Sequence, residues 1–311
     1  MLIFSHFYID VTALRVDRWS LLQAFYEELF KGNYPYFART NIDNPGAPMP
    51  FYFVIFYPFY WIGEVGILCT LGYIAFMVIL QKQNKSAINT KIILLILLST
   101  SLFTYWEITA RSNIFFNSIL ILIALKYYSS IDKKSISKTF IMSAILTGLV
   151  LSTRSIFIVT YATTFLSSLF RKEISIKHLL SYGLIAAATF GLTFLPLLAF
   201  YWDDFWVMNP FMVQSGVIVP TLYVIGFILL GIIFSFLIKK KIDQYFYGGV
   251  ILFIIVSITF VFNSQNLSLR QALLVEGADI SYFIFPIPFL MLYILQTSPK
   301  TNQHQTALPT D

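Results

Sequence analysis

YFVIFYPFYWIGEVGILCTLGYIAFMVILQ, residues 52–81, decides the fold of this chain. The stretch contains one charged residue, Glu64, and is longer than the roughly 20 apolar residues that cross a bilayer as a helix. Its length leaves room for an interfacial piece before Gly63. The whole chain is 58% apolar and 18% aromatic, with a mean hydropathy of +0.75, which is far more apolar than a soluble domain. The sequence therefore predicts an all-α integral membrane protein.

Further apolar runs follow, several of them short for a straight crossing, and together they predict about nine transmembrane helices. The nine runs cover residues 52–81, 92–110, 113–130, 139–153, 155–170, 179–201, 217–238, 246–263 and 280–297. We expect three regions, which are an outer segment (1–50), a transmembrane bundle (51–298) and a polar cytoplasmic tail (299–311). Residues 1–9 are apolar but too short to cross, so they either end a preceding helix or lie at the interface.

Basic residues sort the loops between these runs into two sets. They follow alternate runs and comprise Lys82, Lys85, Lys91, Lys133, Lys134, Lys138, Arg171, Lys172, Lys177, Lys239, Lys240, Lys241 and Lys300. The positive-inside rule places these loops and the C-terminus in the cytoplasm, and residues 1–50 on the opposite face of the cytoplasmic membrane. The net charge of +6 is therefore interpreted as topology, and no nucleic-acid partner is expected.

Polar residues beside the apolar runs follow the same alternation. Those at the outward ends are Glu107, Arg111, Asn113, Arg154, Asp203, Asp204, Asn209, Gln214, Arg270, Glu276 and Asp279. Because a charge at membrane depth costs a few kcal/mol, such a residue usually faces a cavity or a partner. We therefore expect these side chains to converge on one outer cavity, beneath the polar stretch Asp17 to Pro50.

That polar stretch is predicted to begin with an amphipathic surface helix. Over Arg18 to Lys31, one stripe holds Leu22, Phe25, Tyr26 and Leu29, and Gly32 supplies the stop signal. The helix is too short and too charged to span, so it should lie along the outer membrane surface. Residues 33–50 contain four prolines and are expected to form an irregular, turn-rich lid.

Asp17 precedes this helix and has two candidate roles. As an N-cap, its side chain would accept a backbone N–H at the helix start. As a general base, it would take a proton from an acceptor group. The two roles are compatible because a cap fixes the direction of the carboxylate. Asp10 is the competing carboxylate, and nothing local decides between the two.

Three arginines are candidate phosphate ligands, because a guanidinium is always charged and can donate two parallel hydrogen bonds. Arg111 and Arg154 lie at outward helix ends, and Arg270 lies in the last outer loop. The structural alternatives are an i, i+4 pair of Arg111 with Glu107, and a tight turn at Arg154.

No metal site is predicted. Asp203 and Asp204 are adjacent carboxylates without a nearby histidine, which favours a solvated loop start. The single cysteine, Cys69, excludes a disulfide within the chain, and His6, His178 and His304 are scattered. No cofactor is expected, and a requirement for a divalent metal is left open.

The first 65 residues or so resemble the GT-C superfamily of membrane glycosyltransferases, which use polyprenyl-phosphate sugars and include mannosyltransferases. The resemblance lies in Asp17 with its amphipathic segment, in LFKGNYPY at Leu29 to Tyr36, and in NPGAPMPFYFVIFYPFYWIGE at Asn44 to Glu64. Family members normally have a spanning helix before the catalytic loop, and this sequence shows at most its end. An acidic pair is common in some branches, whereas Arg18 follows Asp17 here.

The resemblance implies transfer of a sugar from a polyprenyl-phosphate donor to a lipid or glycan acceptor at the outer membrane face. Asp17 would be the base, and Arg111, Arg154 or Arg270 would bind the donor phosphate. Glu107, Asn113 and Tyr36 would be supporting polar residues. A single displacement would invert the anomeric configuration.

Two alternatives are a transporter or flippase of lipid-linked sugars and a non-catalytic, degenerate paralogue. Transporters tend to carry polar residues near the bilayer midplane and paired broken helices. Clustering of the polar residues at one face favours the enzyme. The sequence does not indicate the sugar, the acceptor, the polyprenol or the oligomeric state.

Overall fold

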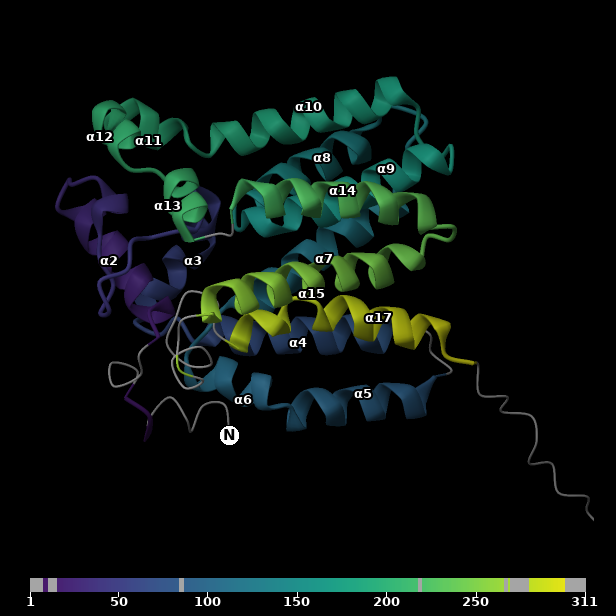
Figure 1. Ribbon diagram of the computed structural model, residues 1–311, viewed down its shortest axis with the longest axis horizontal. Coiled ribbons are helices and arrows are strands. Elements are labelled where there is room, and N and C mark those ends of the chain that lie inside the picture. The colour runs from purple at the N-terminus through teal and green to yellow at the C-terminus, as the bar shows by residue number, and fades with distance from the viewer. Residues whose placement is uncertain are drawn as a thin grey trace, which may run out of the picture.

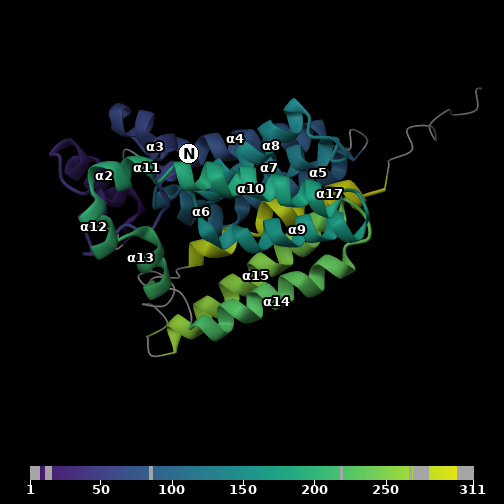
Figure 2. The same cartoon turned by 90° about the horizontal axis from the view of Figure 1, so that it is seen from above.

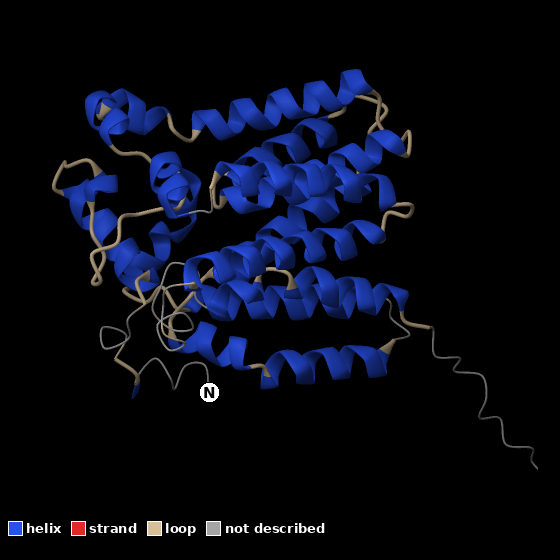
Figure 3. Cartoon of the chain, viewed as in Figure 1, coloured by secondary structure: helices blue, strands red, loops and turns tan. Residues whose placement is uncertain are grey.

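A computed structural model describes residues 8–10, 16–83, 87–217, 220–265, 268 and 280–299. The structure is all-α, with 76% of the chain helical and no strand among the described residues (Figure 3). Backbone pairing of the β type is limited there to an isolated bridge between Arg39 and Pro45. The all-α class that the sequence predicts is therefore confirmed.

The helices follow the apolar runs closely. In chain order they are α2 (Arg18–Phe30), η2 (Pro35–Phe37), α3 (Pro50–Ile62), α4 (Ile67–Lys82), α5 (Ile88–Thr100), α6 (Leu102–Thr109), α7 (Ile114–Ser130), α8 (Lys138–Leu151), η3 (Ser155–Phe157), α9 (Ile158–Phe170), α10 (Ile176–Leu192), α11 (Leu195–Phe200), α12 (Trp202–Val207), α13 (Pro210–Val217), α14 (Thr221–Leu237), α15 (Asp243–Ser264), η4 (Ile280–Ile284) and α17 (Ile287–Thr297).

The long helices lie side by side, and short helices gather at one end of them (Figure 1). That end, here called the cap end, consists of α2, α3, α11, α12 and α13, on the left of Figure 1 and again on the left of Figure 2. Loops 131–137, 171–175 and 238–242 form the opposite end, here called the basic end. Side-chain bonds hold this end together, since Lys133 pairs with Glu173, and Gln244 at the start of α15 donates to Ser129 at the end of α7.

Glycine and serine set several helix boundaries. Gly32 after α2 and Gly63 after α3 have positive φ angles of 80° and 75°, which glycine adopts without the steric cost that a side chain brings. Ser137 and Ser175 cap α8 and α10 by accepting the backbone N–H of Phe140 and His178. The expected stop at Gly32 and the expected break at Gly63 are both present.

The run 52–81 is not one helix. α3 and α4 meet at an angle of 117°, so the piece before Gly63 runs in a different direction from the helix after it. α5 and α6 form a second bent pair, with an angle of 53°. The run 179–201 divides in the same way, because Pro196 in the first turn of α11 lacks the N–H that would continue α10.

Within the described residues, two helical segments are long and apolar enough to cross a membrane. They are Asp243–Ser264 and Ile280–Thr297, and the two bent pairs raise the number to four if each pair is one span. The helices α7, α8, α9, α10 and α14 coincide with expected spans but have 17 residues or fewer, which gives about 26 Å at most. The expected number of nine spans is therefore not confirmed.

The outside of the bundle is apolar. On α14, Leu222 is 77% exposed and Ile233 is 56% exposed, and on α10 Leu184 is 72% exposed. Inside, α8 and α10 approach closely at Gly148, where an added Cβ would lie 2.3 Å from the carbonyl oxygen of Ala186. Glycine at a helix contact permits such an approach.

Candidate functional site

The helix α2 presents the expected apolar stripe to the rest of the cap end. Leu22, Phe25 and Tyr26 are buried, and the ring of Phe25 stacks on Phe53 of α3 with centroids 3.5 Å apart. This confirms an amphipathic helix over nearly the predicted residues. The stripe fixes α2 against α3, and so fixes the position of the residue that precedes it, Asp17.

Asp17 occupies the N-cap position, but its side chain makes no capping hydrogen bond. Its Oδ2 instead accepts a hydrogen bond of 2.9 Å from the side-chain amide of Asn44. Ser20 donates to the backbone oxygen of Asp17 and to Asn41. The Asp17 carboxylate is therefore partly exposed and hydrogen-bonded to Asn44, and it does not cap its own helix.

The start of α3 is joined to the end of α8. The N–H groups of Met49 and Tyr52 donate to the carbonyl oxygens of Thr153 and Ser152, at 3.4 and 3.1 Å, and Phe51 N–H donates to the Ser152 hydroxyl. N–H groups at a helix start and carbonyls at a helix end have no partner within their own helices. The two ends therefore satisfy each other, and the chain that leaves α8 brings Arg154 to Tyr52.

Tyr52 is the centre of the polar contacts at this end. The Arg154 guanidinium lies 5.4 Å from the centroid of the Tyr52 ring, and the side-chain amide of Asn113 donates to the Tyr52 hydroxyl. Asn117 in turn donates to the backbone oxygen and side-chain oxygen of Asn113. The Nε atom of Arg154 is buried and makes no hydrogen bond among the described residues.

Arg18 is a second guanidinium at the same place, and we did not expect it as a site residue. It is only 5% exposed, lies 5.1 Å from the centroid of the Tyr282 ring, and interacts electrostatically with Tyr52. A signal was available, because Arg18 stands four residues before Leu22, on the buried stripe of α2. We call Arg18, Tyr52, Asn113 and Arg154 the Tyr52 cluster, and Asp17 is the residue that precedes Arg18.

Arg111 forms an ion pair with Glu64, which lies outside the Tyr52 cluster. Its Nη1 lies 3.3 Å from the Oε2 of Glu64, whose other oxygen accepts the backbone N–H of Gly66. Arg111 has a φ angle of +47°, in the left-handed region that favours glycine. Glu107 is fully buried and accepts the N–H of Phe115 at 2.7 Å, in the first turn of α7. These contacts stabilise the turn between α6 and α7.

Tyr36 is also part of the packing. Its side chain is fully buried, its hydroxyl donates to the carbonyl of Pro48 at 2.9 Å, and its ring packs edge-on against Phe25. Burial raises the pKa of Tyr36 well above its usual range, so the hydroxyl stays protonated and donates. Tyr36 holds the irregular segment 33–50 on α2, which confirms that this segment forms no long helix.

The remaining sequence candidates lie at the surface, in α12 or outside the described residues. Asp10 is exposed, and Asp203 and Asp204 lie in the first turn of α12. Arg270, Glu276 and Asp279 lie outside the described residues. Within the described ranges, no three His, Cys, Asp or Glu side chains form a group that could hold a metal ion.

Comparison with known proteins gives no match to a family model, to a curated protein or to a solved structure. The function of the Tyr52 cluster therefore has to be inferred from its own residues. Two guanidinium groups, one from α2 and one from the chain after α8, interact with Tyr52, and the partly exposed Asp17 precedes the first of them in the chain. Such a set can take a proton at one point and stabilise an anion close by.

Proposed function

We propose that this chain is a membrane glycosyltransferase of the GT-C type. It transfers a sugar from a polyprenyl-phosphate donor to a lipid or glycan acceptor at the outer face of the cytoplasmic membrane. The observation that carries the proposal is the Tyr52 cluster, in which the arginines Arg18 and Arg154 both interact with Tyr52, and Asp17 precedes Arg18 in the chain. The resemblance of residues 17–64 to that superfamily supports the same assignment.

Membrane insertion is the first part of the proposal. The apolar side chains on the outside of α10 and α14 need a hydrocarbon environment, which supports a bundle of more spans than length alone indicates. The basic loops gather at one end, so the positive-inside rule puts that end and the C-terminus in the cytoplasm. The cap end, with the Tyr52 cluster, then faces outward.

The reaction follows from this placement. Asp17 takes the proton of the acceptor hydroxyl or phosphate as the acceptor oxygen attacks the anomeric carbon of the donor. The bond from that carbon to the phosphate oxygen breaks, and the polyprenyl phosphate leaves with one additional negative charge. Arg154 and Arg18 stabilise this charge. Attack on the face opposite the leaving group gives a product of inverted anomeric configuration.

The arginines do not contribute equally. Arg154 is the main phosphate ligand because its buried Nε has no protein acceptor among the described residues, and Arg18 lies beside the same tyrosine. Arg111 already pairs with Glu64 and orders the adjacent turn, so we assign it a supporting role. Arg270 remains a candidate ligand, and its position lies outside the described residues.

The test of the base is Asp17→Asn, which keeps the size of the side chain and removes its charge. Transfer from a polyprenyl-phosphate sugar by the purified chain should fall at least about a hundredfold, as for loss of a general base. Asp43→Asn is the matched control, because Asp43 is exposed in the same segment. Full transfer by the Asp17 variant would exclude the base assignment.

The test of the phosphate ligand is Arg154→Lys, which keeps the charge but loses the planar pair of donors. The KM for the donor should rise about tenfold, the effect of one lost charge-assisted hydrogen bond. Arg39→Lys is the control, because Arg39 is an exposed arginine of the cap end. Equal donor KM values in the two variants would remove Arg154 from the site.

A further inference from the structure

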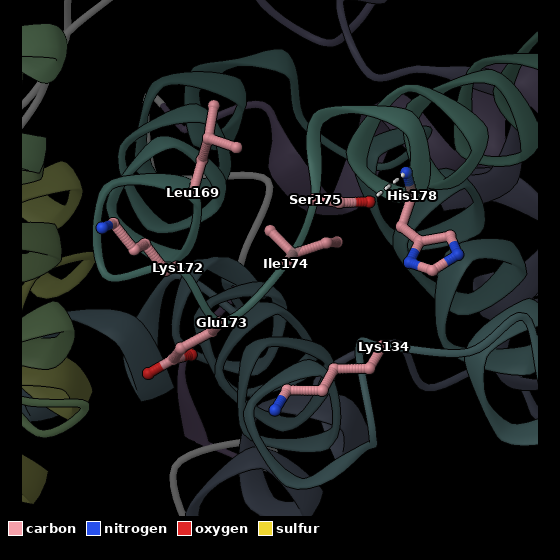
Figure 4. A pocket seen from close by; sticks show the side chains of 7 residues that line it. All are labelled: Lys134, Leu169, Lys172, Glu173, Ile174, Ser175 and His178. Atoms are coloured by element: carbon pink, nitrogen blue, oxygen red, sulfur yellow. Dashed lines mark hydrogen bonds between the residues drawn. The ribbon is translucent and has the colours of Figure 1, made fainter.

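A hollow of about 430 Å³ lies at the basic end of the bundle, far along the helices from the Tyr52 cluster. Loop 131–137 contributes Lys134 to its wall, the turn between α9 and α10 contributes Lys172 and Glu173, and the first turn of α10 contributes His178. Figure 4 shows Lys172 and His178 on opposite sides, with Ile174 between them and Lys134 below. Three nitrogen-bearing side chains thus border one opening.

The acidic residue in this wall is already neutralised. Glu173 accepts hydrogen bonds from Lys133 at 2.8 Å and from the Nε of Arg171 at 3.0 Å. Burial alone would raise the pKa of Glu173, but these two cations lower it to about 2. Glu173 therefore does not repel an anion in the hollow. Neither Lys134 nor Lys172 forms an ion pair within the described part of the chain.

Lys172 occupies a position where glycine would be easier. It follows the end of α9 with a φ angle of +57°, whereas α2 and α3 are followed by Gly32 and Gly63. A non-glycine residue in this conformation costs roughly 1 kcal/mol or more. Arg111 meets the same cost at the end of α6 and has an ion-pair partner. The ammonium of Lys172 has no ion-pair partner among the described residues, so it is available to bind an anion from outside the chain.

Apolar side chains flank the hollow. Ile136, Phe170 and Ile176 are 53%, 42% and 55% exposed. Ile136 lies in the loop that carries Lys134, and Phe170 and Ile176 are each next in sequence to a residue that lines the hollow. Segments 131–138 and 171–178 together hold six Lys or Arg residues and two acidic ones. A basic opening beside exposed apolar side chains suits a molecule with a charged head and hydrocarbon chains.

We propose that this hollow binds the phosphate headgroup of an anionic phospholipid, through Lys134, Lys172 and His178. The proposal rests on the membrane placement given above but not on the glycosyltransferase assignment. The phosphate oxygens accept hydrogen bonds from the two ammonium groups, and the acyl chains contact the apolar flank. The site lies in the leaflet opposite the Tyr52 cluster, so it differs from the site of the sugar donor.

The test uses the full chain in nanodiscs or detergent and measures binding of phosphatidylglycerol by native mass spectrometry. The triple variant Lys134→Gln, Lys172→Gln, His178→Gln should bind about tenfold more weakly than the wild type. Lys240→Gln is the matched control, an exposed lysine of the same end. Phosphatidylcholine should bind weakly to the wild type, to the triple variant and to the control variant. Inorganic phosphate should not displace phosphatidylglycerol.

A second measurement needs no variant. Phosphatidylglycerol should protect Lys134 and Lys172 of the wild-type chain from acetylation, and should leave Lys240 reactive. Equal phosphatidylglycerol binding by the triple and control variants would overturn the proposal. Displacement by inorganic phosphate would also overturn it, since the hollow would then be a site for the free ion. Unchanged acetylation of Lys134 and Lys172 would count against it in the same way.

Discussion

The Nη1 atom of Arg111 lies 3.3 Å from the Oε2 atom of Glu64, and this ion pair connects two chain reversals. Glu64 lies in the bend between α3 and α4, and Arg111 lies in the turn between α6 and α7. The two side chains are 14% and 27% exposed, so solvent screens them only in part. The ion pair fixes the C-terminal end of α3 relative to the start of α7.

Glu64→Gln and Arg111→Gln should each lower the stability of the chain by about 1–2 kcal/mol, between the values for exposed and buried pairs. The double variant should lose less than the sum of the two single losses, because both partners are then neutral. Thermal unfolding in detergent measures all three. The exposed pair Lys31–Glu28 is the control, and its coupling should be smaller than that of Glu64 and Arg111 because solvent screens it. Strict additivity at Glu64 and Arg111 would show that their contact contributes nothing.

Gly148→Ala should destabilise the contact between α8 and α10. The new Cβ would lie 2.3 Å from the Ala186 oxygen and 2.8 Å from the Thr189 Cβ, so the helices must separate, at a cost of about 1–3 kcal/mol. Gly183→Ala in α10 is the matched control, since no atom lies within 4 Å of its Cβ position. Alanine is the better helix former, so the control should gain up to about 1 kcal/mol. Similar melting temperatures for the two variants would contradict this packing.

Cysteines introduced at Asn44 and Asp203 should react with an impermeant thiol reagent added to intact cells, and a cysteine at Lys240 should not. Asp203 belongs to the cap end, Asn44 binds Asp17 at the start of α2, and Lys240 belongs to the basic end. The native Cys69 is 1% exposed, so it should give little background labelling. Labelling at Lys240 alone would reverse the proposed orientation.

Glu173 should make the chain sensitive to acid. Its folded pKa of about 2 lies below the usual 4.5, so its contribution to stability is complete above pH 4.5 and is lost as the pH falls toward 2. Thermal melting as a function of pH should show this loss in the wild type. Glu173→Gln should be less stable at neutral pH and should lack this part of the acid dependence. Glu28→Gln, at an exposed carboxylate, is the control.

Much of the fold could be predicted because its signals are local. The stripe of Leu22, Phe25 and Tyr26 predicted α2, and Gly32 and Gly63 marked the ends of α2 and α3. The apolar runs predicted where the other helices lie. Hydropathy did not separate a straight helix from a bent pair, because an apolar run has the same composition whether or not the chain turns within it.

The candidate site was less accessible from sequence, because its contacts join distant segments. Asn44 binds Asp17 across 27 residues, and Tyr52 meets Asn113 across 61. No local pattern indicates such pairs. Arg18 was not predicted as a site residue, although its spacing of four residues from Leu22 placed it on the buried face of α2.

The junction between α3 and α8 has a consequence for the order in which the protein is made. The N–H of Phe51 and its acceptor, the hydroxyl of Ser152, are 101 residues apart. A ribosome must therefore complete α4 to α8 before the start of α3 can find its acceptors. Until then the N–H groups of Met49 and Phe51 lack these acceptors, so the cap end is completed late in biogenesis.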